Sequence, residues 1–268
     1  MSTFTNKVVV ITGGSDGIGK AMVDLFLLQG AKVATCARKQ EKLYALQTEN
    51  AGKPLHICQA DVSIEADCEK FIQSTLEAFG TIDILINNAG ISMRALFIDT
   101  LPATIKKVMD VNFMGTVYCT HYALPHIIQN KGIIVGISSI AGFRGLPGRS
   151  GYSASKFALN GWLESLRTEL LHSGVQVLTA CPGFTTSNIR VAALNSAGEA
   201  QGETPMDESA MMSSTECAKH IMDAMNNKKR TLVLTFNGKR TVFLNKFLPA
   251  LTDKLVRNFF YKNDQLVK

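Results

Sequence analysis

Three side chains in the middle of the chain have types and spacing that could move a proton. Ser139 precedes Tyr152 by thirteen residues, and Lys156 follows Tyr152 by four. On a helix, a spacing of four places two side chains on one face. A free tyrosine has a pKa of about 10, and the ammonium of Lys156 should lower it. The phenol could then give its proton to a carbonyl oxygen while a hydride reaches the carbonyl carbon.

That pair alone is weak evidence, because a tyrosine and a lysine four residues apart often share an ordinary solvated helix face. The interpretation gains weight only if the surrounding elements build a site around the pair. The first 185 residues do alternate between short apolar runs and amphipathic stretches.

Near-continuous apolar strands separated by helices indicate a parallel sheet that is covered on both faces. We therefore predict an α/β fold, a Rossmann-type doubly wound parallel sheet with helices on both faces, in a single domain spanning residues 1–268. Strands are expected at 7–12, 32–36, 55–59, 82–86, 132–137, 175–180 and 231–234, and helices at 19–30, 64–79, 102–129, 153–173 and 214–226.

A glycine-rich turn, Thr12-Gly13-Gly14-Ser15-Asp16-Gly17-Ile18-Gly19, joins the first expected strand to the first expected helix. Glycines let the backbone approach a pyrophosphate, and the helix N-terminus offers free N–H groups and positive dipole. This turn therefore predicts a dinucleotide site. Its predicted binding residues are Gly13, Ser15, Asp16, Gly17, Ile18 and Gly19.

The end of the second expected strand bears on which dinucleotide binds. An NAD site usually has an acidic residue there, but this chain has Ala37-Arg38-Lys39 and no acid before Glu41. A guanidinium suits a 2′-phosphate, so Arg38 and Lys39 favour NADP(H) over NAD(H). Residues after the third and fourth strands should meet the adenine and the ribose. They are Asp61, Val62, Asn88, Ala89 and Gly90.

Composition places the chain among globular proteins. It has 268 residues, 46% hydrophobic and 19% charged, and no apolar run approaches the ~18 residues of a spanning helix. The polar start, Met1 to Lys7, gives no sign of a secretory signal, so a cytoplasmic location is expected. The six cysteines have no metal-ligand spacing. We expect free thiols and no metal.

The positive charge is concentrated near the C-terminus. Ten basic and two acidic residues from Lys228 to Lys268 give that stretch +8, although the whole chain carries +6. Within it, 239–268 forms a basic tail with apolar residues at helical spacing. The tail could pack on the body or on a second subunit, or lie peripherally on the anionic inner surface of a membrane. No recognisable module predicts nucleic-acid binding.

Periodicity is lost between residues 184 and 214, after a predicted strand end where ligands bind in such sheets. A loop of this length is typical of a substrate lid. We expect its methionines to line an apolar substrate pocket together with side chains from earlier loops. The predicted pocket residues are Ser92, Met93, Phe143, Leu146, Phe184, Met206, Met211 and Met212.

Over about residues 5–190 the chain resembles the short-chain dehydrogenase/reductase family. Tyr152 to Leu171 looks like its hydroxysteroid-dehydrogenase-like branch and is also similar to ketosphinganine reductases. The motifs that carry the resemblance are Thr12–Gly19, Asn87-Asn88-Ala89-Gly90, Asn112, Ser139, Tyr152-x-x-x-Lys156 and Pro182-Gly183.

The resemblance implies a role for each matching residue. Tyr152 would be the acid/base, Lys156 would lower its pKa and hold the nicotinamide ribose, and Ser139 would bond the substrate oxygen. Asn112 would shape the long helix and hold a water in a proton relay. Pro182, Gly183 and Thr185 would lie along the nicotinamide. Asp16 departs from the pattern, since many NADP-preferring relatives have a basic residue there. A homodimer or homotetramer is implied.

These observations lead to two functional hypotheses. The first is an NADP(H)-dependent oxidoreductase that interconverts a hydrophobic ketone and a secondary alcohol. The alternative is a non-catalytic NADP(H)-binding sensor, which would predict loss of catalytic residues. Asn112, Ser139, Tyr152 and Lys156 are all present, and this favours the enzyme.

Overall fold

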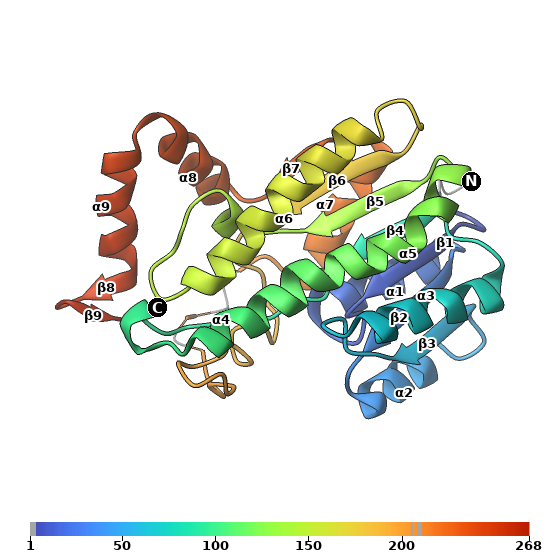
Figure 1. The fold of residues 1–268 in the computed structure, drawn as a ribbon, viewed down its shortest axis with the longest axis horizontal. Coiled ribbons are helices and arrows are strands. Elements are labelled where there is room, and N and C mark those ends of the chain that lie inside the picture. Colours follow the sequence, from blue (N-terminus) through green and yellow to red (C-terminus); the bar gives the residue numbers. More distant parts are fainter. Residues whose placement is uncertain (1–3, 205, 208–210, 268) are drawn as a thin grey trace.

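Seven parallel strands form the sheet at the centre of the protein (Figure 1). The computed structural model describes residues 4–204, 206–207 and 211–267. The strand order is β3-β2-β1-β4-β5-β6-β7, so the order reverses between β1 and β4. Ligands bind outside the carboxyl ends of the strands at such a switch point. The strands are β1 Val8–Thr12, β2 Lys32–Ala37, β3 Leu55–Gln59, β4 Ile84–Asn87, β5 Ile133–Ile137, β6 Gln176–Cys181 and β7 Thr231–Val233.

Helices cover both faces of the sheet, as predicted. One layer contains α1 (Gly17–Leu28), α2 (Gln40–Glu49) and α7 (Ser214–Asn226). The other contains α3 (Glu65–Phe79), α5 (Gly115–Gln129) and α6 (Ser150–Glu169). Before α5 lies α4 (Pro102–Met109), and short helical turns occur at Phe97–Asp99 and Ile140–Gly142.

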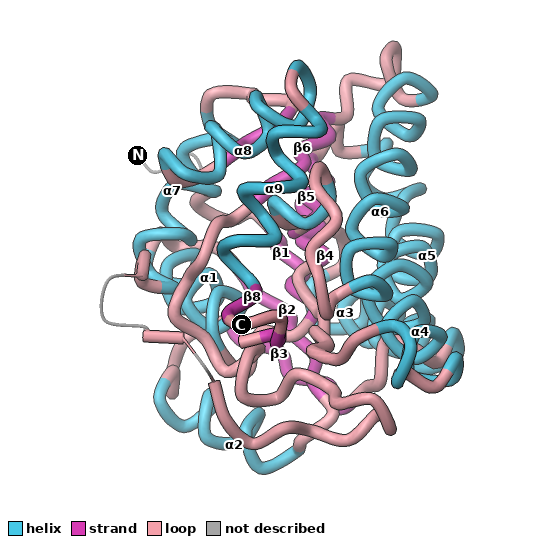
Figure 2. The backbone as a smooth tube through the Cα atoms, turned by 90° about the vertical axis from the view of Figure 1, so that its left-hand side faces the viewer, coloured by secondary structure: helices cyan, strands magenta, loops and turns pink. Residues whose placement is uncertain are grey.

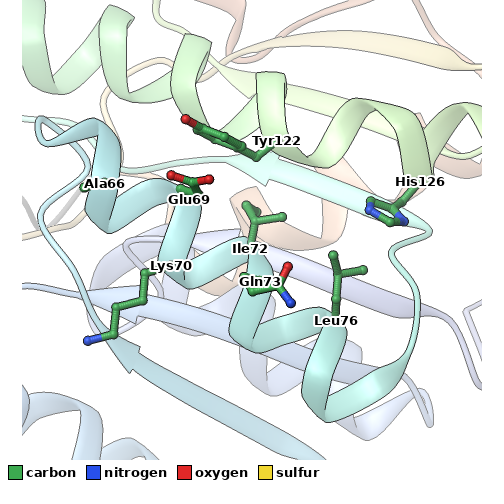
Figure 3. A pocket seen from close by; sticks show the side chains of 8 residues that line it. All are labelled: Ala66, Glu69, Lys70, Ile72, Gln73, Leu76, Tyr122 and His126. Carbon is green, nitrogen blue, oxygen red and sulfur yellow. The ribbon is translucent and has the colours of Figure 1, made fainter.

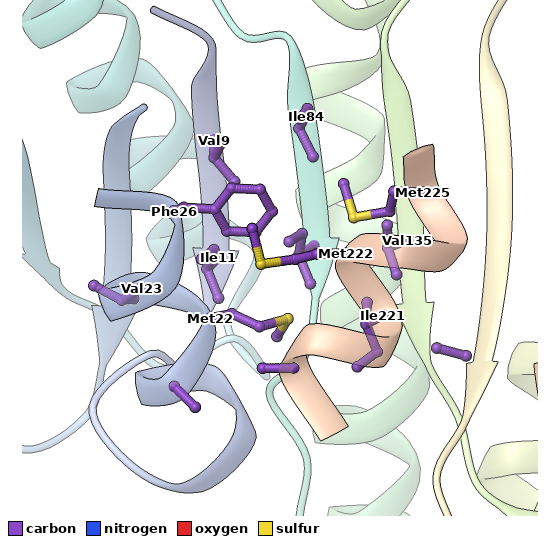
Figure 4. Packing of buried hydrophobic residues seen from close by; sticks show 14 of the residues in the cluster. Val9, Ile11, Met22, Val23, Phe26, Ile84, Val135, Ile221, Met222 and Met225 are labelled. Atoms are coloured by element: carbon purple, nitrogen blue, oxygen red, sulfur yellow. The ribbon is translucent and has the colours of Figure 1, made fainter. Parts of the chain in front are cut away.

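The layer of α1 and α7 shows why these sequences fold as they do. Met22 and Phe26 of α1 meet Met222 of α7 above Ile11 of the sheet, and all four are buried (Figure 4). Burial of each large apolar side chain contributes about 1.5–3 kcal/mol. The apolar periodicity that predicted α1 and α7 is therefore the face that holds them against the sheet.

Helix α2 was not predicted from the sequence. Only Leu43 and Leu46 of its ten residues are buried. Two buried positions give no apolar stripe that periodicity could detect. The other predicted strands and helices are present, with ends shifted by at most a few residues.

The basic tail forms two helices and a small hairpin, which we call the C-terminal arm (residues 235–267). It contains α8 (Phe236–Phe247), α9 (Pro249–Phe260), β8 (Tyr261–Lys262) and β9 (Gln265–Leu266). Figure 1 shows the arm beyond the sheet, and Figure 2 shows α8 and α9 in front of its edge. Arg144 holds the arm to the body by bonding Asn245 at 3.0 Å and Asp253 at 2.5 Å.

The arm leaves the sheet through an unusual residue. Thr235 has φ +63° and ψ 147°, a backbone conformation that is uncommon for a β-branched residue. Its hydroxyl caps α8 by accepting the N–H of Gly238 at 3.1 Å. Across the described ranges of the chain, no helix has the length and apolar character needed to cross a membrane.

Candidate active site

A cavity of about 1010 Å³ opens at the carboxyl ends of the strands and extends to the C-terminal arm. Every residue predicted to bind the cofactor lines it, from Gly13 in the first turn to Thr185 after β6. Ser139, Tyr152 and Lys156 line it as well. The fold therefore brings the predicted cofactor and proton-transfer residues to one place.

The glycine turn after β1 is built for close approach. A Cβ at Gly19 would lie 2.3 Å from the carbonyl oxygen of Gly13, so only glycine fits there. Thr35 of β2 supports the turn, since its hydroxyl accepts the N–H of Gly14 at 3.0 Å and donates to Ile11 O at 2.7 Å. Sequence reasoning missed Thr35, which lies twenty-one residues beyond the glycine that it holds.

Asn88 braces this turn from the next strand. Its amide donates to the carbonyl oxygens of Thr12 at 2.9 Å and Gly13 at 3.1 Å. In return, the Thr12 hydroxyl accepts the N–H groups of Asn88 and Ala89, each at 3.0 Å. The side chains of Asn88 and Thr12 together thus fix the shape of the glycine turn.

Asp16 is the N-cap of α1, and its charge is matched by a lysine that the sequence analysis did not consider. The carboxylate accepts Gly17 N–H at 2.8 Å, Lys42 Nζ at 2.5 Å and Asn188 Nδ2 at 2.9 Å. Burial raises the pKa of Asp16, but the bonds from Lys42 and Asn188 outweigh it and leave the pKa lowered. The apparent conflict between Asp16 and a 2′-phosphate is therefore largely removed by Lys42.

The adenosine end of the cavity carries more positive than negative charge. Three basic side chains, Arg38, Lys39 and Lys42, line this end, and two acidic side chains, Asp16 and Asp61, line it as well. Asp61 is also engaged, because it accepts the N–H and hydroxyl of Ser63 at 3.0 and 2.7 Å. The arrangement fits a nicotinamide dinucleotide, whose phosphates are negatively charged.

The environment of Tyr152 differs from the sequence expectation. Burial raises the pKa of Tyr152 above its usual value, and a hydrogen bond with Ser139 and the charges of Arg149 and Arg190 oppose that rise. We expected Lys156 to bring this pKa below its usual value, but in the structure the pKa of Tyr152 is raised. The Lys156 ammonium lies 5.8 Å from the centre of the Tyr152 ring, and Ser139, Arg149 and Arg190 are the groups that oppose the rise most.

Lys156 is itself buried, with 4% of its surface exposed. Its Nζ donates to Ile137 O at 2.8 Å, and burial lowers its pKa to about 8. An ammonium has three donors, and the bond to Ile137 O uses one of them. A cofactor ribose in the cavity would offer oxygen acceptors for the others.

Asn112 stands behind the cavity wall at an irregular turn. The predicted helix 102–129 is interrupted at Asp110–Met114, where one π turn separates α4 from α5. Such turns are frequent at functional sites. The buried amide of Asn112 accepts Ile91 N–H at 2.8 Å and donates to Ile91 O and Ser155 Oγ, each at 2.9 Å. Asn112 thereby ties the long helix to α6, which carries Tyr152.

The substrate end of the cavity is only partly as predicted. Ser92, Leu146 and Phe184 line it, but Met93, Phe143, Met206, Met211 and Met212 are absent from its described lining. Met93 is fully buried against Val108 and Leu194, and Met212 packs against the α1–α7 layer. The C-terminal arm supplies the apolar wall instead. Its lining residues are Leu244, Leu255, Val256, Phe259 and Phe260.

A second, smaller hollow of about 480 Å³ lies on the outside of the protein between α3 and α5 (Figure 3). Leu76 and Gln73 of α3 face Tyr122 and His126 of α5 across it. None of the predicted site residues lines this hollow. Among the described residues, no group of three or more His, Cys, Asp or Glu side chains is placed to hold a metal ion.

Comparison with known proteins assigns the class. Residues 7–197 match the family model described as short chain dehydrogenase, so the chain belongs to the short-chain dehydrogenase/reductase family. The family binds a nicotinamide cofactor, and the protein is an oxidoreductase.

Individual relatives support this assignment. Mouse dehydrogenase/reductase SDR family member 7B is 34% identical over 254 residues, covering 92% of this chain and 79% of the mouse protein. The 11-beta-hydroxysteroid dehydrogenase-like protein 4A of Arabidopsis thaliana is 34% identical over 250 residues, covering 91% and 82%. A Burkholderia phymatum short-chain dehydrogenase/reductase, solved in complex with NAD, has a TM-score of 0.83 at 23% identity, covering 94% and 96%. That structural likeness shows the fold.

Proposed function

We propose that the protein is an NADP(H)-dependent oxidoreductase that interconverts a hydrophobic ketone and a secondary alcohol. The observation that carries the proposal is that Ser139, Tyr152 and Lys156 line the same cavity as the glycine turn. A proton donor and a cofactor site meet there. The apolar wall from the C-terminal arm supports a hydrophobic substrate.

Each residue has a defined task in this reaction. The nicotinamide, when bound, supplies or accepts the hydride. Tyr152 gives its proton to the carbonyl oxygen, or takes it back in the direction of oxidation. Ser139 bonds the same oxygen and holds the Tyr152 hydroxyl. Lys156 holds the ribose of the nicotinamide cofactor, and the positive charges of Arg149 and Arg190 favour the phenolate left on Tyr152. Because the site is buried, these charges act strongly on the reacting oxygen.

Tyr152→Phe tests the assignment while keeping the ring in place. We expect turnover of NADPH across a panel of apolar ketones to fall at least ~100-fold, because the proton donor is lost. NADPH affinity, followed by its fluorescence, should change little. Tyr44→Phe is the matched control, since Tyr44 is an exposed tyrosine of α2 outside the cavity.

Two outcomes would contradict the proposal. Turnover that survives Tyr152→Phe would remove Tyr152 from the mechanism. NADPH binding without turnover of any ketone or alcohol by the unchanged protein would favour the non-catalytic sensor instead.

A further inference from the structure

Beside Tyr152 the cavity contains a buried arginine whose charge is not paired by the part of the chain that the structure describes. Arg149 is 7% exposed and lines the cavity. Its Nε is buried without a hydrogen-bond partner, and its guanidinium lies 5.8 Å from the centre of the Phe260 ring. An arginine has five N–H donors, so most of the side-chain donors of Arg149 have no acceptor among the described residues.

Neighbouring arginines show that this is a property of Arg149 itself. Arg94 bonds the side chain of Gln201, and Arg190 donates to Thr185 O at 2.9 Å. A buried charge without a partner is strongly unfavourable, and buried charges in proteins are normally paired. Arg149 therefore stands in a site that is complete only when another molecule supplies the acceptor.

The charges around Arg149 select an anionic acceptor. Burial lowers the pKa of Arg149, and the positive charges of Arg94 and Arg190 add to that effect. The acidic side chains in the described lining, Asp16 and Asp61, belong to the opposite, adenosine end of the cavity. This end of the cavity is thus positive, and a carboxylate can pair with a guanidinium through two parallel hydrogen bonds.

We propose that the substrate carries a carboxylate that pairs with Arg149, so that the protein interconverts oxo acids and hydroxy acids that have an apolar tail. This inference rests on the proposed function and narrows its substrate class. Arg149 is the N-cap of α6 and precedes Tyr152 by three residues, and its positive charge acts on the Tyr152 hydroxyl. The carboxylate would accordingly lie within a few carbons of the reacting carbon.

The remainder of the pocket fits the rest of such a molecule. Leu146 and the arm residues Leu244, Leu255 and Val256 line the same cavity as Arg149 and would hold an alkyl tail. In reduction, the carbonyl carbon gains a hydride with its two electrons from the reduced nicotinamide, and the carbonyl oxygen gains a proton from Tyr152. The carboxylate is unchanged and serves only to orient the molecule.

Matched substrates test the inference without altering the protein. Decanoates with the oxo group at the α, γ or δ carbon are compared with their methyl esters, which have the same chain and ketone but no charge. We expect kcat/KM for the preferred acid to exceed that for its ester at least ~10-fold. Arg149→Met should remove this preference of at least ~10-fold and bring the acid-to-ester ratio of kcat/KM to about 1, as expected for loss of a charge-assisted pair.

Two further variants separate charge from folding. Arg149→Lys keeps a positive charge and should retain part of the preference for the acid. Arg167→Met is the matched control, since Arg167 is a partly buried arginine of α6 that bonds Val177 O at 3.1 Å outside the cavity. The control should leave the acid-to-ester ratio unchanged.

Calorimetry provides a measurement that needs no turnover. Octanoate should bind the full chain saturated with NADP⁺, octanol should bind more weakly, and Arg149→Met should remove the difference. The inference is overturned if the unchanged protein prefers the esters or binds octanoate no better than octanol. It is also overturned if Arg149→Met lowers acid and ester turnover equally, which is the mark of a purely structural residue. In those cases turnover of neutral ketones, with its dependence on Tyr152, would still stand.

Discussion

Lys156 is a nearly completely buried cation, and the free energy of unfolding should therefore depend on pH where this residue titrates. Burial lowers its pKa to about 8 from 10.5. Between those two values the unfolded chain binds more protons at this residue than the folded chain does. The contribution of Lys156 to the free energy of unfolding therefore rises as pH increases from about 8 to 10.5.

A comparison with Lys156→Met isolates this contribution, because the raised pKa values of Tyr152 and of Cys36 act in the opposite direction and cancel in the difference. Denaturant unfolding without cofactor should show the difference, unchanged protein minus variant, growing by up to about 1.4 kcal/mol per pH unit. A difference that is flat across this range would mean that Lys156 titrates normally.

The choice of cofactor is also decided at single residues. If Arg38 pairs with a 2′-phosphate, Arg38→Ala should weaken NADPH binding roughly 10- to 100-fold and leave NADH within about 2-fold, as loss of a charge-assisted bond predicts. Lys42→Ala should act in the same direction, because it leaves Asp16 unpaired.

Fluorescence titration of both cofactors measures this preference. Arg257→Ala is a suitable control, since Arg257 lies on the arm outside the cavity and pairs with Asp264. Equal losses for NADPH and NADH with Arg38→Ala would speak against a 2′-phosphate contact.

At the scale of elements, the position of α6 decides where Tyr152 and Lys156 lie. Gly136 of β5 allows α6 to approach closely, because a Cβ there would lie 2.4 Å from Cδ1 of the buried Leu163. Gly136→Ala should lower the free energy of unfolding by about 1–3 kcal/mol through overpacking. It should also reduce kcat more than it raises KM, because displacement of α6 misplaces the reacting groups.

Leu163→Val should partly suppress this effect by removing the clashing atoms, so the double variant should be more stable than the sum of the single changes predicts. Gly161→Ala on the same helix is the control, since a Cβ there meets nothing within 4 Å. It should be neutral or slightly stabilising. Additive effects of Gly136→Ala and Leu163→Val would show that the contact is not limiting.

The sequence predicted those elements whose apolar pattern is also their buried face, and it missed contacts that span elements. The strands and α1, α3, α5, α6 and α7 follow from periodicity, whereas α2 does not. Lys42 was overlooked because its partner, Asp16, is twenty-six residues away. Arg149 follows Pro147-Gly148 and has the sequence context of an exposed loop, so its burial under Phe260 could not be read from spacing.

At the scale of the whole molecule, the C-terminal arm has two sides. One side lines the cavity, whereas Phe243 and Phe247 of α8 remain 62% and 59% exposed beside basic residues such as Lys246. We propose that this outer side binds an anionic membrane surface, for which apolar side chains and positive charge are both required. The alternative from the sequence is a contact with a second subunit.

Flotation with vesicles distinguishes the two. The full chain should float with anionic vesicles, less so at high salt, and fail to float with neutral ones. Phe243→Ser with Phe247→Ser should abolish binding, whereas Leu28→Ser, at an exposed apolar residue of α1, should not. Loss of a dimer in the double variant, without any vesicle binding, would identify the outer side as a subunit contact.

The proposed catalytic groups and the apolar pocket wall come from different parts of the chain, and this affects how a protein of this kind can acquire new substrates. The groups proposed for proton transfer and cofactor binding all precede residue 186, and the match to the family model ends at 197, whereas the apolar pocket wall comes from one continuous stretch after Thr235. A single genetic crossover near that codon would exchange the wall and leave the chemistry intact. Chimaeras joined at Thr235 should consequently inherit the reaction and the Arg149 site from one parent, and the apolar wall, with the tails that it accepts, from the other.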